Sequence, residues 1–226
     1  MLEPVRSAPD LAHTVHARLR DAIVAGRLAP GARLAQEDLA AQFGISRQPI
    51  LQALSLLERD RLAVRADGRG TLQVAPLDPD LVRQFYELRA EVDALAARRA
   101  AERVAGGIEQ PLPGVLLERG VKALRRGDLG ALIAADTLLH HAIYQASGNP
   151  LLESVMTPQW RHLERIMGAV LRPSSVRAGL WDEHAAIVAA INQGRAAQAA
   201  RLSREHAVRA ARGMLPRLAE RMNLTA

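Results

Sequence analysis

The chain has 226 residues, of which 49% are hydrophobic, 24% are charged and 3% are aromatic, proportions typical of a folded soluble protein. It contains no cysteine, which excludes a disulfide framework, a cysteine-ligated zinc site and a thiol nucleophile, while the net charge of +6 permits nucleic-acid binding without showing it. Because no uncharged apolar run of about eighteen residues and no signal-peptide core occurs, we expect a cytoplasmic protein with no membrane partner.

The N-terminal part contains three predicted helices. The first covers residues 11–26, and a second, short helix covers residues 35–45 and ends at Gly44, with apolar residues at helical spacing in both. The third follows Ser46 over residues 47–61, and a serine in that position is a favourable N-cap. Two short helices joined at a glycine predict a helix-turn-helix.

Two brief alternating runs follow the third helix. Leu62 and Val64 form the first run, and Leu72 and Val74 form the second, on either side of the sequence ADGRG. Alternation around a glycine-containing turn predicts a β-hairpin. We therefore interpret residues 1–76 as a winged helix-turn-helix domain with a small wing.

The rest of the chain, residues 77–226, predicts an all-α bundle. Pro76 and Pro79 mark the boundary, because the residue before a proline disfavours helix. Glycine- and proline-containing breaks then divide the chain into about six helical segments, at residues 79–105, 113–126, 128–147, 150–171, 174–193 and 195–222. The predicted fold class is thus mainly α.

Four polar side chains of the bundle form a candidate metal site. Asp136 and His140 are four residues apart, so they share one helical face, and His184 and His206 lie on two further amphipathic helices. Three imidazoles and a carboxylate suit a divalent ion such as Zn²⁺, Ni²⁺ or Mn²⁺. A spacing of four is also common for acid–base pairs on exposed helices, so the residues alone leave open whether this face meets water, a core or a metal.

Other histidines lack such a pattern. His141 points about a quarter turn away from His140 and is expected not to bind a metal. His13, His16 and His162 are interpreted as ordinary residues of the surface or of the N-terminal domain.

The motifs resemble those of the GntR family of bacterial transcription regulators, in the FadR-type branch with an FCD domain. The N-terminal match is AIVAGRLAPGARL, then LAAQFGISRQPILQAL, then GRGT; the C-terminal match is DTLLHHAI, ASGNPLL, and the histidines at 184 and 206. About six helices after the linker resembles the smaller, VanR-like subgroup. The resemblance spans nearly the whole chain.

The resemblance implies a function for both domains. It places a divalent metal on Asp136, His140, His184 and His206, beside a small-molecule effector that is usually a carboxylate. Arg89 matches a helical arginine that can meet the effector carboxylate, although a surface arginine is an equally good interpretation of the residue itself.

On the DNA side, the resemblance implies that the third helix enters the major groove of double-stranded operator DNA. Arg47 suits guanine, Gln48 and Gln52 can reach base edges, and phosphate or wing contacts are implied for Arg33, Ser46, Arg69 and Gly70. The family pattern SRTPVREAL is SRQPILQAL here. Leu51 thus replaces an arginine, which puts the usual operator sequence in doubt.

The resulting hypothesis is a ligand-responsive regulator without enzyme activity, more often a repressor, that binds a palindromic operator as a homodimer. The segment VAPLDPD would be its hinge. Two alternatives remain at this point. One is a metal-dependent hydrolase that uses the Asp/His cluster, which would lack an obvious general base. The other is an all-α scaffold whose histidines are structural.

Overall fold

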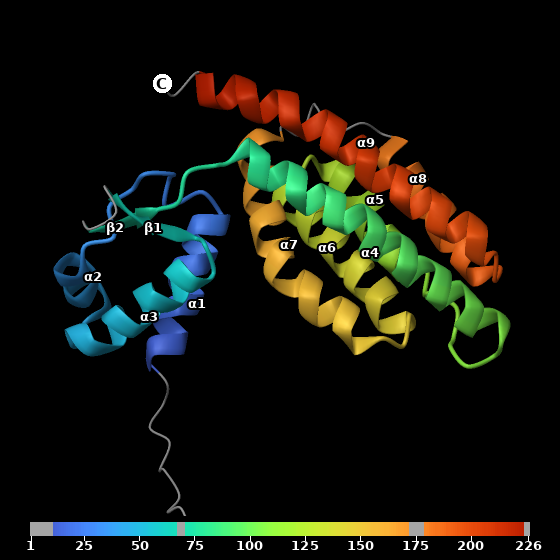
Figure 1. Ribbon diagram of the computed structural model, residues 1–226, viewed down its shortest axis with the longest axis horizontal. Coiled ribbons are helices and arrows are strands. Elements are labelled where there is room, and N and C mark those ends of the chain that lie inside the picture. The colour runs from blue at the N-terminus through green and yellow to red at the C-terminus, as the bar shows by residue number, and fades with distance from the viewer. Residues whose placement is uncertain (1–10, 67–70, 172–178, 224–226) are drawn as a thin grey trace, which may run out of the picture. The chain divides into compact units, whose positions relative to one another are not determined.

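The structure of the protein is a computed structural model that describes residues 11–66, 71–171 and 179–223, in two compact units, Met1–Leu77 and Asp78–Ala226 (Figure 1). Each unit has its own core, so each is described by itself. Within the described ranges, no helix is both long and apolar enough to cross a membrane.

The first unit is a winged helix-turn-helix. Its elements are α1 (Leu11–Val24), α2 (Gln36–Phe43), α3 (Arg47–Arg59), β1 (Ala63–Arg65) and β2 (Leu72–Val74). The two strands pair antiparallel, with Ala63 opposite Val74 and Arg65 opposite Leu72. The helix-turn-helix and the wing predicted from the sequence are therefore present, and α3 is held in place by buried aliphatic residues at Ile50, Ala53, Leu54 and Leu57.

The turn between α2 and α3 depends on a glycine. Gly44 has φ 65° and ψ 35° and ends α2 in the left-handed region, which a residue without a Cβ adopts at little cost. Ser46 occupies the N-cap of α3 with extended backbone angles, as predicted, but its side chain makes no capping hydrogen bond. Its hydroxyl group therefore remains exposed beside the first turn of α3.

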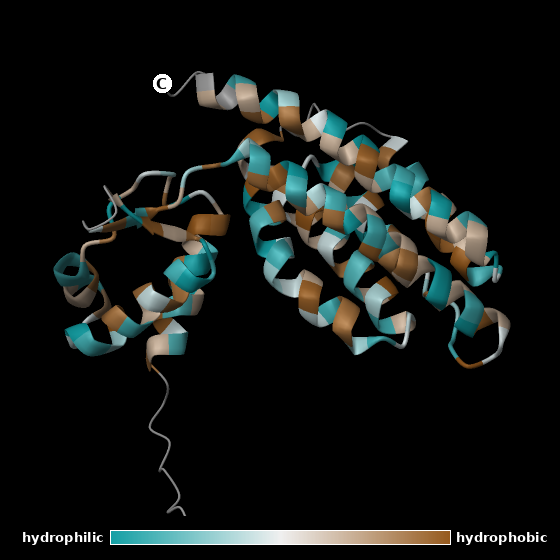
Figure 2. Ribbon diagram, viewed as in Figure 1, coloured by the Kyte–Doolittle hydropathy of each residue, from teal (hydrophilic) through white to brown (hydrophobic). Residues whose placement is uncertain are grey.

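The second unit is a bundle of helices, as predicted from the sequence. In the described part of the chain these helices are α4 (Pro79–Ala105), α5 (Val115–Arg126), α6 (Leu129–Ala146), α7 (Pro150–Val170), α8 (Gly179–Asn192) and α9 (Ala196–Asn223). Figure 2 shows that the hydrophobic residues lie mainly where the helices face one another.

Three of these helices begin at side-chain caps. The carboxylate of Asp78 accepts hydrogen bonds from the backbone of α4, that of Asp128 from Ala131, and the amide oxygen of Asn149 from Leu151. Pro79 and Pro150 follow two of these caps, where a missing N–H costs nothing. Local sequence signals thus set where these helices begin.

Two long helices, α4 and α9, run antiparallel along the bundle (Figure 1). Their contact uses small residues: Ala96, Ala97, Ala100 and Ala101 on α4 and Ala199 and Ala207 on α9 are completely buried. Small side chains let the two backbones approach closely, and this approach brings polar residues from both helices into one interior region.

Two of the histidines interpreted as ordinary residues are not on the surface. His162 is 7% exposed, with its ring 5.1 Å from that of Phe85, so a surface position for it is wrong. His16 is also buried, and its Nε2 lies 2.8 Å from a carboxylate oxygen of Asp60. Both rings fill helical positions that face a core, which periodicity alone did not assign.

Candidate metal centre and nucleic-acid interface

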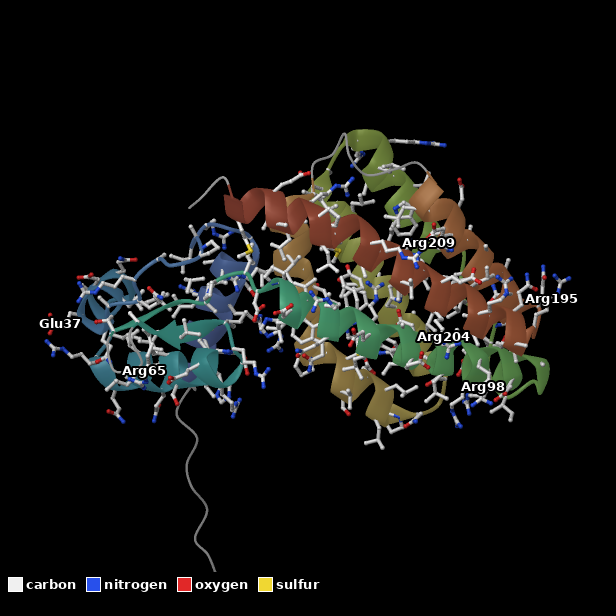
Figure 3. The ribbon with its side chains drawn as sticks, turned by 45° about the horizontal axis from the view of Figure 1, so that its top comes forward. Glu37, Arg65, Arg98, Arg195, Arg204 and Arg209 are labelled. Carbon is white, nitrogen blue, oxygen red and sulfur yellow. The ribbon has the colours of Figure 1, made fainter. Side chains whose placement is uncertain are left out.

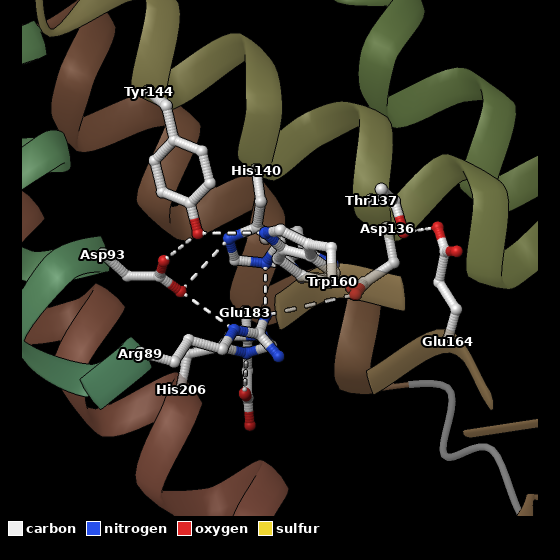
Figure 4. Close-up of polar contacts among 11 residues, drawn as sticks. Arg89, Asp93, Asp136, Thr137, His140, Tyr144, Trp160, Glu164, Glu183 and His206 are labelled. Atoms are coloured by element: carbon white, nitrogen blue, oxygen red, sulfur yellow. Dashed lines mark hydrogen bonds and ion pairs between the residues drawn. The ribbon is translucent and has the colours of Figure 1, made fainter. Parts of the chain in front are cut away.

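The four candidate metal ligands come together inside the second unit. Asp136 and His140 project from α6, His184 from α8 and His206 from α9, and all four are buried. One potential ligand atom of each lies within 4.8 Å of those of the other three. The face that carries Asp136 and His140 therefore looks into the bundle rather than at water (Figure 4).

His140 is oriented by two residues of α4. Arg89 Nη2 lies 2.7 Å from His140 Nε2, and because a guanidinium group can only donate, Nε2 is the accepting nitrogen. The proton of the neutral ring is then on Nδ1, which lies 3.2 Å from Asp93 Oδ2. This tautomer directs the lone pair of Nε2 toward Arg89 and the side of Asp136.

Asp93 is the centre of a buried polar network. It accepts a hydrogen bond from Arg89 Nε at 3.0 Å and another from the Tyr144 hydroxyl at 2.5 Å (Figure 4). Tyr144 in turn accepts a hydrogen bond from Trp160 Nε1 at 3.2 Å. Burial would raise the pKa of Asp93, but His140 and Arg89 outweigh burial and hold it far below its usual range.

His206 is oriented from the opposite side. Its Nδ1 lies 2.9 Å from Glu183 Oε2, and Arg209 Nε donates to the other oxygen of the same carboxylate at 2.9 Å. His140 and His206 thus both place Nδ1 against a carboxylate, and Nε2 of His140 meets Arg89. Carboxylates that orient histidines in this way are the usual support of metal-binding imidazoles.

Among the residues that the structure describes, none forms a hydrogen bond with either ring nitrogen of His184, although His184 is completely buried. Its Nε2 lies 3.1 Å from Asp136 Oδ1, which is an ion-pair distance. An unpartnered buried imidazole normally costs about 1–3 kcal/mol. Coordination of a cation would give this ring the partner that the protein does not supply.

The electrostatics of the cluster favour a bound cation. Burial lowers the pKa of His206 to about 4, even though Glu183 opposes this shift, and burial together with Arg89 lowers the pKa of His140. Burial alone would raise the pKa of Asp136, but His184, His140 and Arg89 hold it well below its usual range. Near neutral pH, His140 and His206 are therefore neutral and Asp136 is charged, as metal ligands must be.

The size of the cluster also fits one ion. Two metal–ligand bonds of about 2.0–2.2 Å laid end to end span about 4 Å, close to the 4.8 Å within which the ligand atoms lie. Nitrogen and oxygen donors from three imidazoles and one carboxylate suit zinc, nickel or manganese. The residues present could therefore hold a divalent metal.

A hydrolytic centre is less well supported, because the two nearby carboxylates are already engaged. Hydrogen bonds from His206 and Arg209 lower the pKa of Glu183 to about 2 against the effect of burial. Asp93 is enclosed by Arg89, His140 and Tyr144. A general base needs a pKa near the working pH, and neither carboxylate has one.

Arg89 is completely buried, at 1% exposure, so its interpretation as a surface arginine is wrong. Burial would lower its pKa, but Asp93 and Asp136 raise the pKa above the ordinary arginine value, so it stays charged. The guanidinium carbon lies 4.4 Å from the centre of the Trp160 ring. Arg89 therefore brings a fixed positive charge to the edge of the candidate metal centre.

The first unit presents one polar face on α3. Ser46, Arg47, Gln48, Leu51 and Gln52 are all exposed, while Ile50, Ala53 and Leu54 point into the core. Side chains on such a face can reach base edges when the helix lies in a major groove. The substituted Leu51 is 42% exposed on the same face.

Other predicted DNA contacts lie near this face. Arg33 is exposed, and its Nη2 donates to the Thr71 hydroxyl at 3.5 Å. Arg47 forms an exposed ion pair with Glu37 of α2 at 2.9 Å, and Figure 3 shows Glu37 at the edge of this unit. Arg69 and Gly70 lie outside the described residues.

The sequence analysis missed three residues around the candidate metal centre. Asp93 and Glu183 orient two histidines, and Trp181 packs against His184 with ring centres 4.7 Å apart. The available signal for Asp93 was its position four residues after Arg89 on a helix whose same face is rich in alanine. His141 is outside the cluster, with Nδ1 3.2 Å from Glu153.

Comparisons with known proteins agree with this architecture. Residues 84–209 match the family model of the FCD domain, and residues 11–72 match the model of bacterial regulatory proteins of the gntR family. The chain is 30% identical over 200 residues to the HTH-type transcriptional regulator LutR of Bacillus subtilis, which covers 77% of this chain and 87% of that protein.

Two further similarities are weaker in sequence. The gluconate operon transcriptional repressor of Bacillus licheniformis is 22% identical over 170 residues, covering 75% of this chain and 67% of that protein. The crystal structure of a GntR transcriptional regulator from Rhodococcus sp. RHA1 has a TM-score of 0.75 at 22% identity, covering 91% of this chain and 97% of that chain.

Proposed function

The chain belongs to the GntR family of bacterial transcription regulators with an FCD domain, and from this premise we propose that it is a ligand-responsive repressor. It binds a palindromic operator as a homodimer and is released by a small carboxylate that binds beside a divalent metal. The observation that carries this proposal is the buried cluster of Asp136, His140, His184 and His206, which lies in the same chain as an exposed DNA-reading helix.

The metal is proposed to bind all four residues of the cluster, with zinc as the expected ion and nickel or manganese as the alternatives. When bound, it supplies a positive centre that can accept an oxygen of the effector carboxylate. Asp93 and Glu183 hold His140 and His206 in the orientation that this requires. Metal binding through His140 Nε2 uses the lone pair that Arg89 contacts at 2.7 Å, so a guanidinium N–H becomes available to an anion.

Arg89 is accordingly the proposed effector contact of the protein itself. It is charged, buried and adjacent to the metal ligands. A carboxylate that binds both Arg89 and the metal bridges α4 to α6, α8 and α9. The effector can regulate DNA binding only if it binds the DNA-competent and DNA-incompetent states with different affinity.

The DNA contacts are proposed to come from α3 and its neighbours. Arg47, Gln48 and Gln52 read base edges, Ser46 and Arg33 contact phosphates, and Arg69 and Gly70 belong to the wing contact. Two copies related by a two-fold axis read two half-sites about one helical turn apart. The first unit carries 10 basic and 8 acidic residues over positions 1–77, so specific side chains rather than overall charge must provide the affinity.

The test begins by selecting operator DNA from a random pool with the purified, zinc-loaded full-length chain. The selected duplex is then titrated by fluorescence anisotropy with and without carboxylic acids of different classes. We expect a two-fold symmetric consensus and at least one acid that weakens binding by about 5- to 150-fold. Failure to enrich any sequence would contradict the DNA-reading role, and unchanged affinity with every acid that binds would contradict the switch.

A further inference from the structure

A cavity of about 90 Å³ lies beside the candidate metal centre, and its lining has two chemically different ends. Arg89, Asp136, His206 and Trp181 form the polar end. The remaining wall is largely apolar and includes Leu132, Ile133, Met167, Leu171, Leu180 and Met214, although Tyr86, Arg209 and Arg217 also line it. The cavity is therefore shaped for a molecule with one charged group and a hydrocarbon body.

The volume limits the size of that molecule. A water-sized group takes up about 10–15 Å³ of such space, so 90 Å³ holds on the order of six to nine non-hydrogen atoms. A short aliphatic or a single-ring aromatic acid fits this limit.

The polar end has an unsatisfied donor. Trp181 is 4% exposed, and its Nε1 has no hydrogen-bond partner in the described part of the protein. Buried donors normally find an acceptor, but Nε1 is not accessible from the cavity, so a ligand reaches it only if the indole ring turns. Arg89 and the metal-binding cluster make this end of the cavity suitable for a single carboxylate, and the indole ring of Trp181 forms the wall beside them.

The aliphatic end selects against further polar groups. A hydroxyl group buried there without a partner costs about tenfold in affinity. Arg209 and Arg217 also line the cavity. The guanidinium group of Arg209 already forms ion pairs with Glu183 at 2.9 Å and Glu205 at 3.6 Å, and Arg217 is also engaged within the protein. A second carboxylate on the ligand would have to displace one of these partners.

We propose that the effector is a small monocarboxylic acid with a hydrocarbon or single-ring aromatic body, bound with its carboxylate toward Arg89, Trp181 and the metal centre. This inference rests on the proposed function, because it assumes that the effector is a carboxylate of that site. It separates this protein from a relative such as the gluconate operon repressor of Bacillus licheniformis, whose name indicates a polyhydroxy acid.

The test is calorimetric titration of the zinc-loaded full-length protein with four probes. Hexanoate has the proposed chemistry, adipate adds a second carboxylate, gluconate adds hydroxyls, and hexan-1-ol removes the charge. We expect hexanoate to bind about tenfold or more tightly than adipate and hexan-1-ol, and about a hundredfold more tightly than gluconate. Tighter binding of adipate or gluconate, or no binding of hexanoate, overturns the inference.

Two matched variants of α6 locate the site. Ile133 is half-buried and lines the cavity, whereas Leu138 on the same helix is exposed and does not. Ile133→Gln should weaken hexanoate binding by about tenfold, and Leu138→Gln should leave it unchanged. Equal binding by both variants would place hexanoate elsewhere and overturn the proposal. Retained zinc content and operator affinity in each variant confirm that it is folded.

The proposed function and this inference can fail separately. If gluconate rather than hexanoate binds and releases the operator, the ligand class is wrong while the ligand-responsive repressor stands. If hexanoate binds at the Ile133 site but leaves operator affinity unchanged, the ligand class is supported and the regulatory role of the site is not.

Discussion

At the scale of single residues, the second unit is defined by buried charges that satisfy one another. Arg89 and Asp93 are four residues apart on α4 and are both nearly inaccessible, at 1% and 2% exposure. Such a pair is costly to bury, and its value lies in what it orients. Here Asp93 faces His140 Nδ1 and Arg89 faces His140 Nε2, so the pair fixes one ring of the candidate metal centre.

Replacing His184 tests the metal centre directly. In His184→Ala we expect the zinc content to fall from about one ion per chain to near zero, because one of four ligands is lost. Excess zinc should raise the melting temperature of the parent protein but not of the variant, since only a bound ligand stabilises the folded state. Metal analysis and thermal melts measure both.

His141→Ala is the matched control for this change. His141 is adjacent to a ligand in sequence but contacts Glu153 instead of the cluster. The His141→Ala variant should therefore have the same zinc content as the parent protein. Equal zinc content in the His184 and His141 variants would show that the cluster is not the metal site.

Replacing Asp93 tests the support of His140. Asp93→Asn preserves the shape of the side chain but removes the charge that faces Arg89 and His140. We expect the free energy of unfolding to fall by about 3–5 kcal/mol, as for a broken buried ion pair, and zinc affinity to fall by about 10- to 100-fold. Denaturant unfolding and competition with a chelator measure the two effects.

Glu91→Gln is a control on the same helix. Glu91 is exposed and pairs with Arg204 of α9, whose position on that helix is labelled in Figure 3. Its replacement should leave zinc affinity unchanged. A loss of zinc in this variant similar to that in Asp93→Asn would show that any charge change on α4 acts on the centre, and would contradict a specific role for Asp93.

At the scale of elements, the helices of the bundle are held together by small residues at close approaches. Gly120 of α5 lies directly against the indole ring of Trp181 on α8: a Cβ at position 120 would come within 1.8 Å of that ring. The absence of a side chain at Gly120 therefore allows Trp181 to pack directly against α5. Because Trp181 also lines the cavity, this packing positions its indole ring at the polar end.

Gly120→Ala should destabilise the protein even though alanine is the better helix former. Helix propensity favours the change by up to about 1 kcal/mol, whereas forcing a buried ring aside costs about 1–3 kcal/mol. The indole ring of Trp181 cannot move without disturbing His184, so the cost of the clash should exceed the gain in helix propensity. Denaturant unfolding measures the change, and tryptophan fluorescence, measured in a Trp160→Phe background, reports the surroundings of Trp181.

Gly130→Ala provides the comparison within a neighbouring helix. Gly130 is exposed in the first turn of α6, and an added Cβ there would meet only an oxygen of Asp128 at 3.6 Å, an ordinary contact. This variant should be neutral or more stable. If both glycine variants were equally stable, the close approach of Gly120 to Trp181 would not constrain the bundle.

The exposed face of α3 leads to a prediction about DNA binding. Arg47 is exposed at the start of α3, and a bidentate contact to guanine is worth about 1–3 kcal/mol. Arg47→Ala should therefore weaken operator binding by about 5- to 150-fold and relax the preference at one position of each half-site. Anisotropy titrations with single-base operator variants measure both quantities.

The control for Arg47 is Arg18→Ala. Arg18 is an exposed arginine of α1 and lies outside the helix-turn-helix, so the variant removes the same charge without removing a proposed base contact. Its pattern of base preference should match that of the parent protein. A parallel loss of preference in the two variants would indicate that only charge, and not the α3 face, determines the sequence that is bound.

At the scale of the whole molecule, the proposal depends on two copies that act together. A single helix-turn-helix contacts only a few base pairs, so sequence specificity requires two DNA-binding domains at a fixed separation. Inserting about five base pairs between the half-sites rotates one of them by about half a turn. We expect this insertion to reduce affinity to that of a single half-site, while the mass of the free protein in light scattering remains that of a dimer.

An insertion of about ten base pairs separates the effect of rotation from that of distance. It returns the second half-site to its original face of the DNA but moves it farther from the first half-site. Binding that recovers partly would indicate extension of the linker around residues 74–80. Binding that does not change with any insertion would contradict a symmetric dimer on a palindrome.

The sequence by itself determined the class of the protein and the identity of its elements. Turn glycines and helical periodicity act over a few residues, so the winged helix-turn-helix and, in the described part of the chain, the helical bundle follow from local signals. The resemblance carried by short motifs pointed to Asp136, His140, His184 and His206. Metal binding by these four residues is a prediction, and the zinc content of His184→Ala tests it.

Tertiary structure decided which polar residues are buried together. A sequence gives the face of a helix but not the helix that covers it, so Arg89 and His162 could be read as surface residues although both are buried. Asp93, Glu183 and Trp181 gained their roles only when α4, α8 and α9 met α6 across the bundle. The physical reason is that burial, hydrogen bonding and cavity shape depend on contacts between residues far apart in the chain, which no local pattern specifies.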